Sequence, residues 1–64
     1  MKPLSPAEEE VVERVARGDT DKRIALDLGK GHLTVRDQIQ SARQKLGAKT
    51  RAHLVSLWLK AKPW

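Results

Sequence analysis

The segment LTVRDQIQSARQKLG, residues 33–47, is rich in side chains that form directed hydrogen bonds. At about 100° per residue its apolar side chains fall within one narrow arc of a helix, and these are Val35, Ile39, Ala42 and Leu46. The opposite arc and its edges hold Arg36, Asp37, Gln40, Ser41 and Gln44. A face selected only for solubility usually favours Glu and Lys, whereas Gln, Ser and Arg pair with base edges and phosphate oxygens. The segment therefore predicts a helix with one buried face and one face suited to nucleic acid, with an ordinary solvated face as the alternative.

The charge of the chain favours the same kind of partner. Thirteen Lys and Arg residues outnumber eight Asp and Glu residues, so the net charge is +5. Four glutamates between positions 8 and 13 make one side of the first predicted helix acidic, and the positive excess therefore lies after residue 20. Such a distribution predicts a polyanionic partner, and nucleic acid before a membrane surface.

Length and composition argue against several other functions. Sixty-four residues form one small domain, spanning 1–64, with no room for a catalytic cleft around Ser5, Asp19 or His32. There is no cysteine, and His32 and His53 are too far apart in sequence to be a ligand pair at helical spacing. No stretch resembles a signal peptide or a membrane span. We expect a cytoplasmic protein that is not an enzyme and has no cofactor, metal or small-molecule ligand.

Gly and Pro divide the chain into four predicted helices. The first runs from Pro6 to Arg17, because Ser5 can cap it and Glu8 completes a capping box. A short second helix follows a cap at Thr20 or Asp19 and ends before two glycines, and the other two cover residues 33–46 and 51–60. No β signal is present, so the fold class is all-α.

The apolar positions of these helices predict a common core. Its expected members are Val11, Val15, Ile24, Leu28, Val35, Ile39, Leu46 and Leu54. A short helix, a turn containing glycine and a longer helix are also the parts of a helix-turn-helix unit. In that unit the N-terminal half of the longer helix enters the major groove of DNA.

Four stretches resemble the LuxR/GerE-type helix-turn-helix domain of bacterial transcription regulators. They are LSPAEEEVV, VARGDTDKRIALDLG, TVR and RQKLGAKTRAHLV, and together they extend from residue 4 to about residue 59. The resemblance implies four helices, the third as the recognition helix and the fourth often used for dimerisation. It also matches Thr34 and Arg36 to a TVK segment that usually contacts phosphates and bases. Lys45 matches a KLG helix end, and Lys22 matches an NKEIA helix start.

The departures from the family pattern concern the exposed face and the turn before it. Asp37 replaces a residue that is usually small or apolar, Gln38 replaces a common His, and Gln40 stands where Lys is frequent. Lys30 and Gly31 replace an apolar residue and a serine in the turn. Phosphates repel an aspartate, but its carboxylate can accept a hydrogen bond from the amino group of cytosine. We therefore expect an altered sequence preference, or alternatively a fold reused after DNA binding was lost.

Two sets of residues are assigned to DNA from this pattern. Those expected to hold the phosphate backbone are Lys22, Thr34, Lys45 and Lys49. Those expected to face the bases are Arg36, Asp37, Gln40 and Ser41, with Gln44 on the same face. The predicted function is a stand-alone, sequence-specific transcription regulator that binds double-stranded DNA. The alternative is a protein-interaction module that reuses the fold to bind and modulate a larger regulator.

The fourth predicted helix carries more apolar side chains than packing requires. We expect a homodimer through this helix, with an interface formed by Leu57, Trp58, Leu59 and Trp64. The alternative is that Trp58 belongs to the core of the domain and Trp64 to a frayed end.

Overall fold

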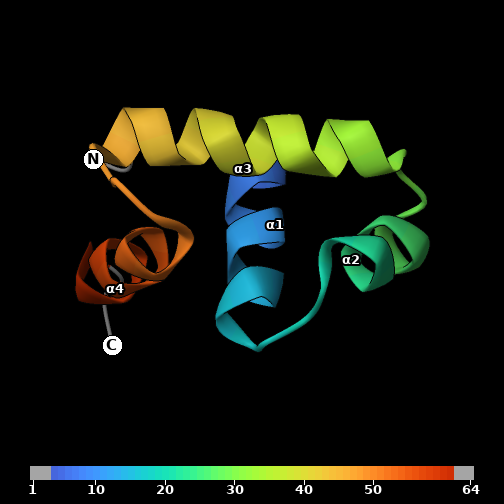
Figure 1. Cartoon of the computed structure of the whole chain (residues 1–64), viewed down its shortest axis with the longest axis horizontal. Helices are drawn as coiled ribbons and strands as arrows, with labels where there is room; N and C mark the ends of the chain where they lie inside the picture. Colours follow the sequence, from blue (N-terminus) through green and yellow to red (C-terminus); the bar gives the residue numbers. More distant parts are fainter. Residues whose placement is uncertain (1–3, 62–64) are drawn as a thin grey trace.

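The computed structural model describes residues 4–61, which form four helices and no strand. The helices are α1 (Pro6–Ala16), α2 (Asp21–Leu28), α3 (His32–Leu46) and α4 (Arg51–Ala61) (Figure 1). The all-α prediction is confirmed. Three boundaries differ by one residue from the predicted ones: α1 ends at Ala16, α3 begins at His32 and α4 extends to Ala61.

Side-chain caps explain where three of the helices begin. At α1 the Ser5 hydroxyl accepts from the Glu8 N–H at 3.2 Å, and the Glu8 carboxylate accepts from the Ser5 N–H at 2.9 Å. This reciprocal pair is the capping box expected from the sequence. Thr20 caps α2 by accepting from the N–H of Arg23, and Thr50 accepts from the N–H of His53 in α4.

Two glycines end the middle helices. Gly29 follows α2 with φ at 65°, and Gly47 follows α3 with φ at 70°, so both are in the left-handed region that residues with a Cβ rarely adopt. The chain can therefore turn sharply from α2 into α3 and from α3 into α4. These two turns fix the direction of α3 relative to its neighbours.

The helices α1, α2 and α4 all lie on one side of α3. Figure 1 shows α3 along the longest axis of the molecule, with α1 beneath its middle and with α2 and α4 toward its two ends. Within the described residues α1 packs against each of the other helices, whereas α2 and α4 do not pack against each other. The opposite side of α3 is consequently uncovered along its length.

The core lies between α1 and the inner face of α3. Six of the eight predicted core residues are buried, while Leu28 and Leu46 are half-buried and pack against the core. Residues not on the predicted list complete the core, namely Leu4, Val12, Ala25, Ala42, Ala48 and Trp58. The interior is thus built from small aliphatic groups and one indole, which suits a domain whose largest extent is 28 Å.

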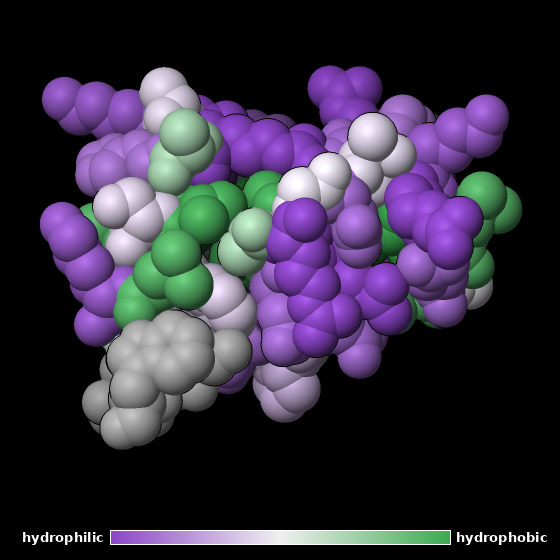
Figure 2. Space-filling model, turned by 90° about the horizontal axis from the view of Figure 1, so that it is seen from below, coloured by the Kyte–Doolittle hydropathy of each residue, from purple (hydrophilic) through white to green (hydrophobic). Residues whose placement is uncertain are grey.

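The surface away from α3 is unevenly polar. Figure 2 shows hydrophobic residues gathered at the α4 end and a smaller hydrophobic area at the α2 end, with hydrophilic residues between them. Within residues 4–61, none of the helices combines the length and the apolar character that crossing a bilayer would need.

Candidate nucleic-acid interface

The uncovered side of α3 presents five exposed polar residues, which we call the open face. They are Thr34, Arg36, Asp37, Gln40 and Gln44. The inner positions Val35, Ile39 and Ala42 are buried, so the apolar and polar sides of this helix are oriented as the sequence predicts. Because α1, α2 and α4 lie on the other side, no part of the described domain blocks an approach to the open face (Figure 1).

Ser41 and Lys45, which were assigned to DNA from the sequence, contact Glu8 of α1 instead of projecting freely. The Ser41 hydroxyl donates to Glu8 Oε2 at 2.6 Å, and Lys45 Nζ lies 2.7 Å from Glu8 Oε1. Ser41 is half-buried, and the side chain of Lys45 is 42% exposed. Both polar groups are therefore already engaged by Glu8, which leaves fewer of their donors for a contact with DNA.

Glu8 remains ionised over the whole neutral range. Hydrogen bonds from Lys45, from Ser41 and from the backbone N–H of Ser5 lower the pKa of this carboxyl group from 4.5 to about 2, although burial acts in the opposite direction. The same carboxylate therefore closes the capping box of α1 and holds two positions of α3. Sequence reasoning identified the cap, but the contacts with α3 span 33 and 37 residues and have no local signal.

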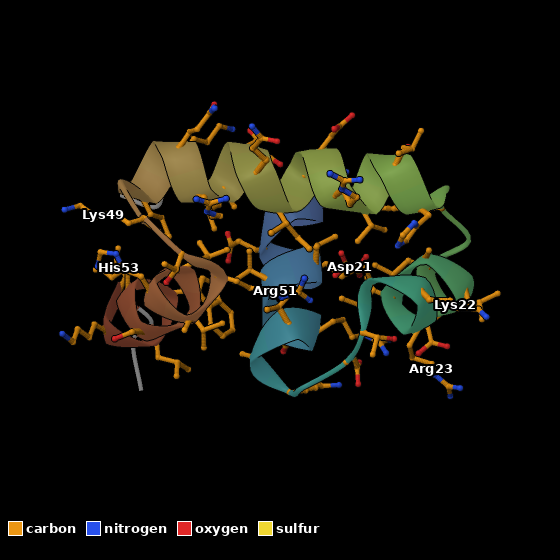
Figure 3. All side chains as sticks on the ribbon, in the orientation of Figure 1. Asp21, Lys22, Arg23, Lys49, Arg51 and His53 are labelled. Atoms are coloured by element: carbon orange, nitrogen blue, oxygen red, sulfur yellow. The ribbon has the colours of Figure 1, made fainter. Side chains whose placement is uncertain are left out.

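A basic pocket of about 200 Å³ lies where α3 passes the N-terminal ends of α2 and α4. It is lined by Asp21, Arg36, Ile39, Gln40, Arg43 and Arg51. Asp21 Oδ1 and Arg51 Nη1 form an ion pair at 2.5 Å. Figure 3 shows these two side chains directed toward one another from α2 and α4. The ion pair thus connects two helices that do not pack together.

Three arginines and one aspartate give this pocket a positive balance. Arg43 donates through Nη2 to the Lys49 carbonyl at 2.7 Å, while its Nε is buried without a hydrogen-bond partner among the described residues. Arg36 connects the pocket to the open face because it contributes to both. Guanidinium groups in such a position suit a phosphate group, two oxygens of which can accept two parallel hydrogen bonds from one arginine.

Lys49 has a well-fixed backbone and an exposed side chain. Its carbonyl accepts from Arg43, and its N–H donates to His53 Nδ1 at 3.1 Å. Lys22, the other lysine assigned to the phosphate backbone outside α3, is also exposed. Figure 3 shows Lys22 and Lys49 near opposite ends of the long axis, which α3 follows. One exposed lysine therefore lies toward each end of the long axis, on the side of α3 where α2 and α4 pack.

Charge along the chain also favours an anion on the α3 side. Asp37 is the last acidic residue, and six Lys and Arg residues follow it. In the first half, Asp27 is shared by two arginines, lying 2.9 Å from Arg14 and 3.3 Å from Arg23. The second half of the chain therefore carries the positive excess, although Lys45 and Arg51 pair with Glu8 and Asp21 of the first two helices.

Comparison with known proteins decides the family. A model described as bacterial regulatory proteins of the luxR family matches residues 2–58. The chain belongs to that family. Its members are DNA-binding transcription regulators, so the resemblance inferred from the sequence is confirmed. Among curated proteins and among solved structures, no significant match to the chain is found.

The turn of this luxR-family domain lacks a side-chain cap. Gly31 is the N-cap residue of α3 with φ at −69° and ψ at 150°, and no side chain there accepts a hydrogen bond. No acidic residue lies in the first turn of the helix. Lys30 Nζ donates to Gln38 Oε1 at 3.1 Å, which directs Gln38 back toward the turn.

On α4 the luxR-family domain offers a smaller apolar patch than the sequence suggests. Trp58 is buried with 8% of its surface exposed, so it belongs to the core, as in the alternative interpretation. Leu57 is half-buried against that core, and Leu59 is 41% exposed. Trp64 lies outside the described residues. Two other leucines, Leu26 and Leu33, are more exposed than Leu59, at 69% each. Neither of these exposed positions is predicted from the sequence.

Proposed function

We propose that this chain is a sequence-specific transcription regulator that reads the major groove of DNA with the open face of α3. The observation that supports this most strongly is the arrangement of the helices: α3 has three helices on one side and five exposed polar residues on the other. A protruding helix of this kind fits the major groove, and its N-terminal half approaches the bases. Membership of the luxR family makes DNA the expected ligand of that face.

Within the open face we assign different roles to individual side chains. Arg36 and Gln40 can donate to base edges, and Asp37 accepts from the amino group of cytosine. Thr34 and Gln44 lie at the two ends of the face and suit the sugar-phosphate backbone or a flanking base. Asp37 is repelled by phosphates, so it lowers affinity for DNA in general and favours sites that present a cytosine to it.

The phosphate backbone is proposed to follow the basic residues on either side of α3. Lys22 and Lys49 lie toward its two ends, and Arg43 and Arg51 line the pocket beside it. Contacts of this kind position the protein without reading sequence. We assign Ser41 and Lys45 only a secondary role in DNA binding, because Glu8 already engages both of their polar groups.

A single copy reads only a few base pairs, so we also propose a homodimer. Two α4 helices related by a two-fold axis would bring Leu59 and the exposed part of Leu57 of one copy against those of the other. Such a dimer would read two half-sites about one helical turn apart. A regulator of the bacterial chromosome acts in the cytoplasm, which is where we place this chain.

Selection from a random pool of DNA duplexes, followed by a salt titration, tests the proposal. We expect one sequence motif to be enriched and its affinity to fall steeply with salt, because binding releases counterions from the phosphates. Enrichment of no motif and a flat salt dependence would contradict DNA binding. A protein-interaction module would then explain the fold better.

A further inference from the structure

Leu33 is an exposed apolar residue in the first turn of α3. Its side chain is 69% exposed, although leucine is usually buried. It precedes Asp37 by four residues and Gln40 by seven, which are the spacings that place helical residues on the same side. At about 100° per residue, these three positions fall within about 60° of one another. Leu33 therefore belongs to the stripe that we assign to the bases.

Exposure alone does not distinguish this residue, because Leu26 is exposed to the same extent. Single apolar residues on a protein surface are common and need no function. Leu26, however, lies on α2, outside the open face. What separates the two leucines is position: Leu33 lies in line with Asp37 on the helix side that the rest of the domain leaves uncovered.

The major groove of DNA has one apolar group at the base edges, the C5-methyl group of thymine. We propose that Leu33 is a specificity-determining residue that contacts the methyl group of a thymine in each half-site. This inference rests on the proposed function, since it requires the open face to lie in the major groove. It adds an apolar contact to a recognition surface otherwise composed of hydrogen-bonding groups.

Helix geometry places this thymine near the base pair read by Asp37. Four residues advance an α-helix by about 6 Å, and successive base pairs are about 3.4 Å apart. The thymine is therefore expected within about two base pairs of the cytosine that Asp37 favours. A half-site with both bases at this separation is the sequence signature of the proposal.

The start of α3 leaves room for this approach. Gly31 has no side chain, and the first turn contains no acidic residue. A Cβ atom at Gly31 would meet only Thr34 Oγ1, at 3.7 Å. The start of α3 thus has no side chain at Gly31 and no negative charge in its first turn, so neither repels DNA beside Leu33.

Replacement of a thymidine in the DNA by deoxyuridine provides the test, because it removes only the C5-methyl group of the base. Each thymine of the selected duplex is replaced in turn, and affinity is measured for the natural chain, for Leu33→Ala and for Leu26→Ala. For the natural chain we expect one replacement to weaken binding by about 3- to 5-fold, the effect of one buried methyl group. Leu33→Ala should lose this sensitivity, whereas Leu26→Ala should retain both the sensitivity and the original affinity.

The outcomes separate this inference from the proposed function. If the natural chain binds a selected motif but no deoxyuridine replacement matters, or if Leu33→Ala keeps the sensitivity, the methyl contact is wrong and the function stands. A selected motif that contains no thymine would likewise contradict the methyl contact and leave the proposed function standing. If no motif is selected at all, the proposed function fails and the inference fails with it. Thermal unfolding of both variants shows that the fold is unchanged.

Discussion

Lys45 Nζ of α3 lies 2.7 Å from Glu8 Oε1 of α1, and this contact joins α3 to the first cap of the fold. Ser41, one turn earlier on α3, donates to the other oxygen of the same carboxylate. One acidic side chain therefore sets both the start of α1 and the position of α3 relative to it. Loss of that carboxylate should affect stability first and DNA recognition second.

Glu8→Gln tests this relationship. The amide keeps the size of the side chain but removes the charge that Lys45 faces, and it cannot accept all of the present hydrogen bonds. We expect the free energy of unfolding at pH 7 to fall by about 1 to 3 kcal/mol, a range that allows for solvent around the half-exposed Lys45. Urea melts measure this value, and Glu10→Gln, an exposed position of the same helix, is the matched control.

The same substitution should change the response to acid. The pKa of Glu8 is lowered in the folded state to about 2 from 4.5, so its contribution is complete above about pH 4.5 and is lost as the pH falls toward 2. The natural chain should lose stability over this interval by more than Glu8→Gln does. If the free energy of unfolding fell equally with pH in both proteins, the Glu8 carboxylate would not be held as the contacts indicate.

Gly31→Ser should stabilise the domain. Gly31 has φ −69° and ψ 150°, close to the −70° and 161° of the capping residue Ser5, and there is space for a Cβ atom. A serine hydroxyl could accept from an N–H of the first turn of α3, and serine also restricts the unfolded chain more than glycine does. Together these effects are worth about 0.5 to 1 kcal/mol.

Gly29→Ser is the contrasting variant for that measurement. Gly29 has φ 65°, a conformation that a serine adopts only with strain, so stability should fall by about 1 kcal/mol. Thermal or urea melts of the two variants should move in opposite directions. A loss of stability in Gly31→Ser would contradict the proposed cap geometry.

Dimerisation should depend on Leu59. This side chain is 41% exposed on α4, so Leu59→Lys should weaken self-association without unfolding the domain. Leu57 is a poorer test because it packs partly against the core. Sedimentation over a wide range of concentration measures the effect, and Leu26→Lys is the control at an exposed leucine of α2. A natural chain that stays monomeric both free and on DNA would contradict the dimer.

Asp37→Ala should relax sequence preference at one base pair. The carboxylate is exposed on α3 and is the only acidic group of that helix, so its removal should also raise affinity for DNA in general. Selection with the variant should give the motif of the natural chain without its preference for cytosine at one position. Identical motifs for both proteins would mean that Asp37 does not face a base.

Much of the fold could be predicted from local signals. Ser5, Thr20 and the glycines Gly29 and Gly47 mark helix ends through their own backbone and side-chain chemistry, and periodicity placed Ile39 inside and Asp37 outside. These features depend on residues a few positions apart. The sequence therefore indicates them directly.

The tertiary contacts of the site could not be predicted in this way. Glu8 reaches Lys45 across 37 residues, and Asp21 pairs with Arg51 only because α2 and α4 both meet the side of α3. Helical spacing alone does not decide between an exposed and a buried Trp58, because it does not show how far neighbouring helices cover this side chain. Such partners become visible only when the helices are placed in space.

The most direct measurement compares Arg36→Ala with Arg17→Ala on the selected duplex at one salt concentration. Both variants remove one exposed arginine, but Arg36 belongs to the open face of α3, whereas Arg17 follows α1 at the end far from α3 (Figure 1). If α3 reads DNA, Arg36→Ala should weaken binding by about 1 to 3 kcal/mol, and Arg17→Ala should bind almost as the natural chain does. Equal losses in both variants, or no loss in either, would contradict recognition through α3.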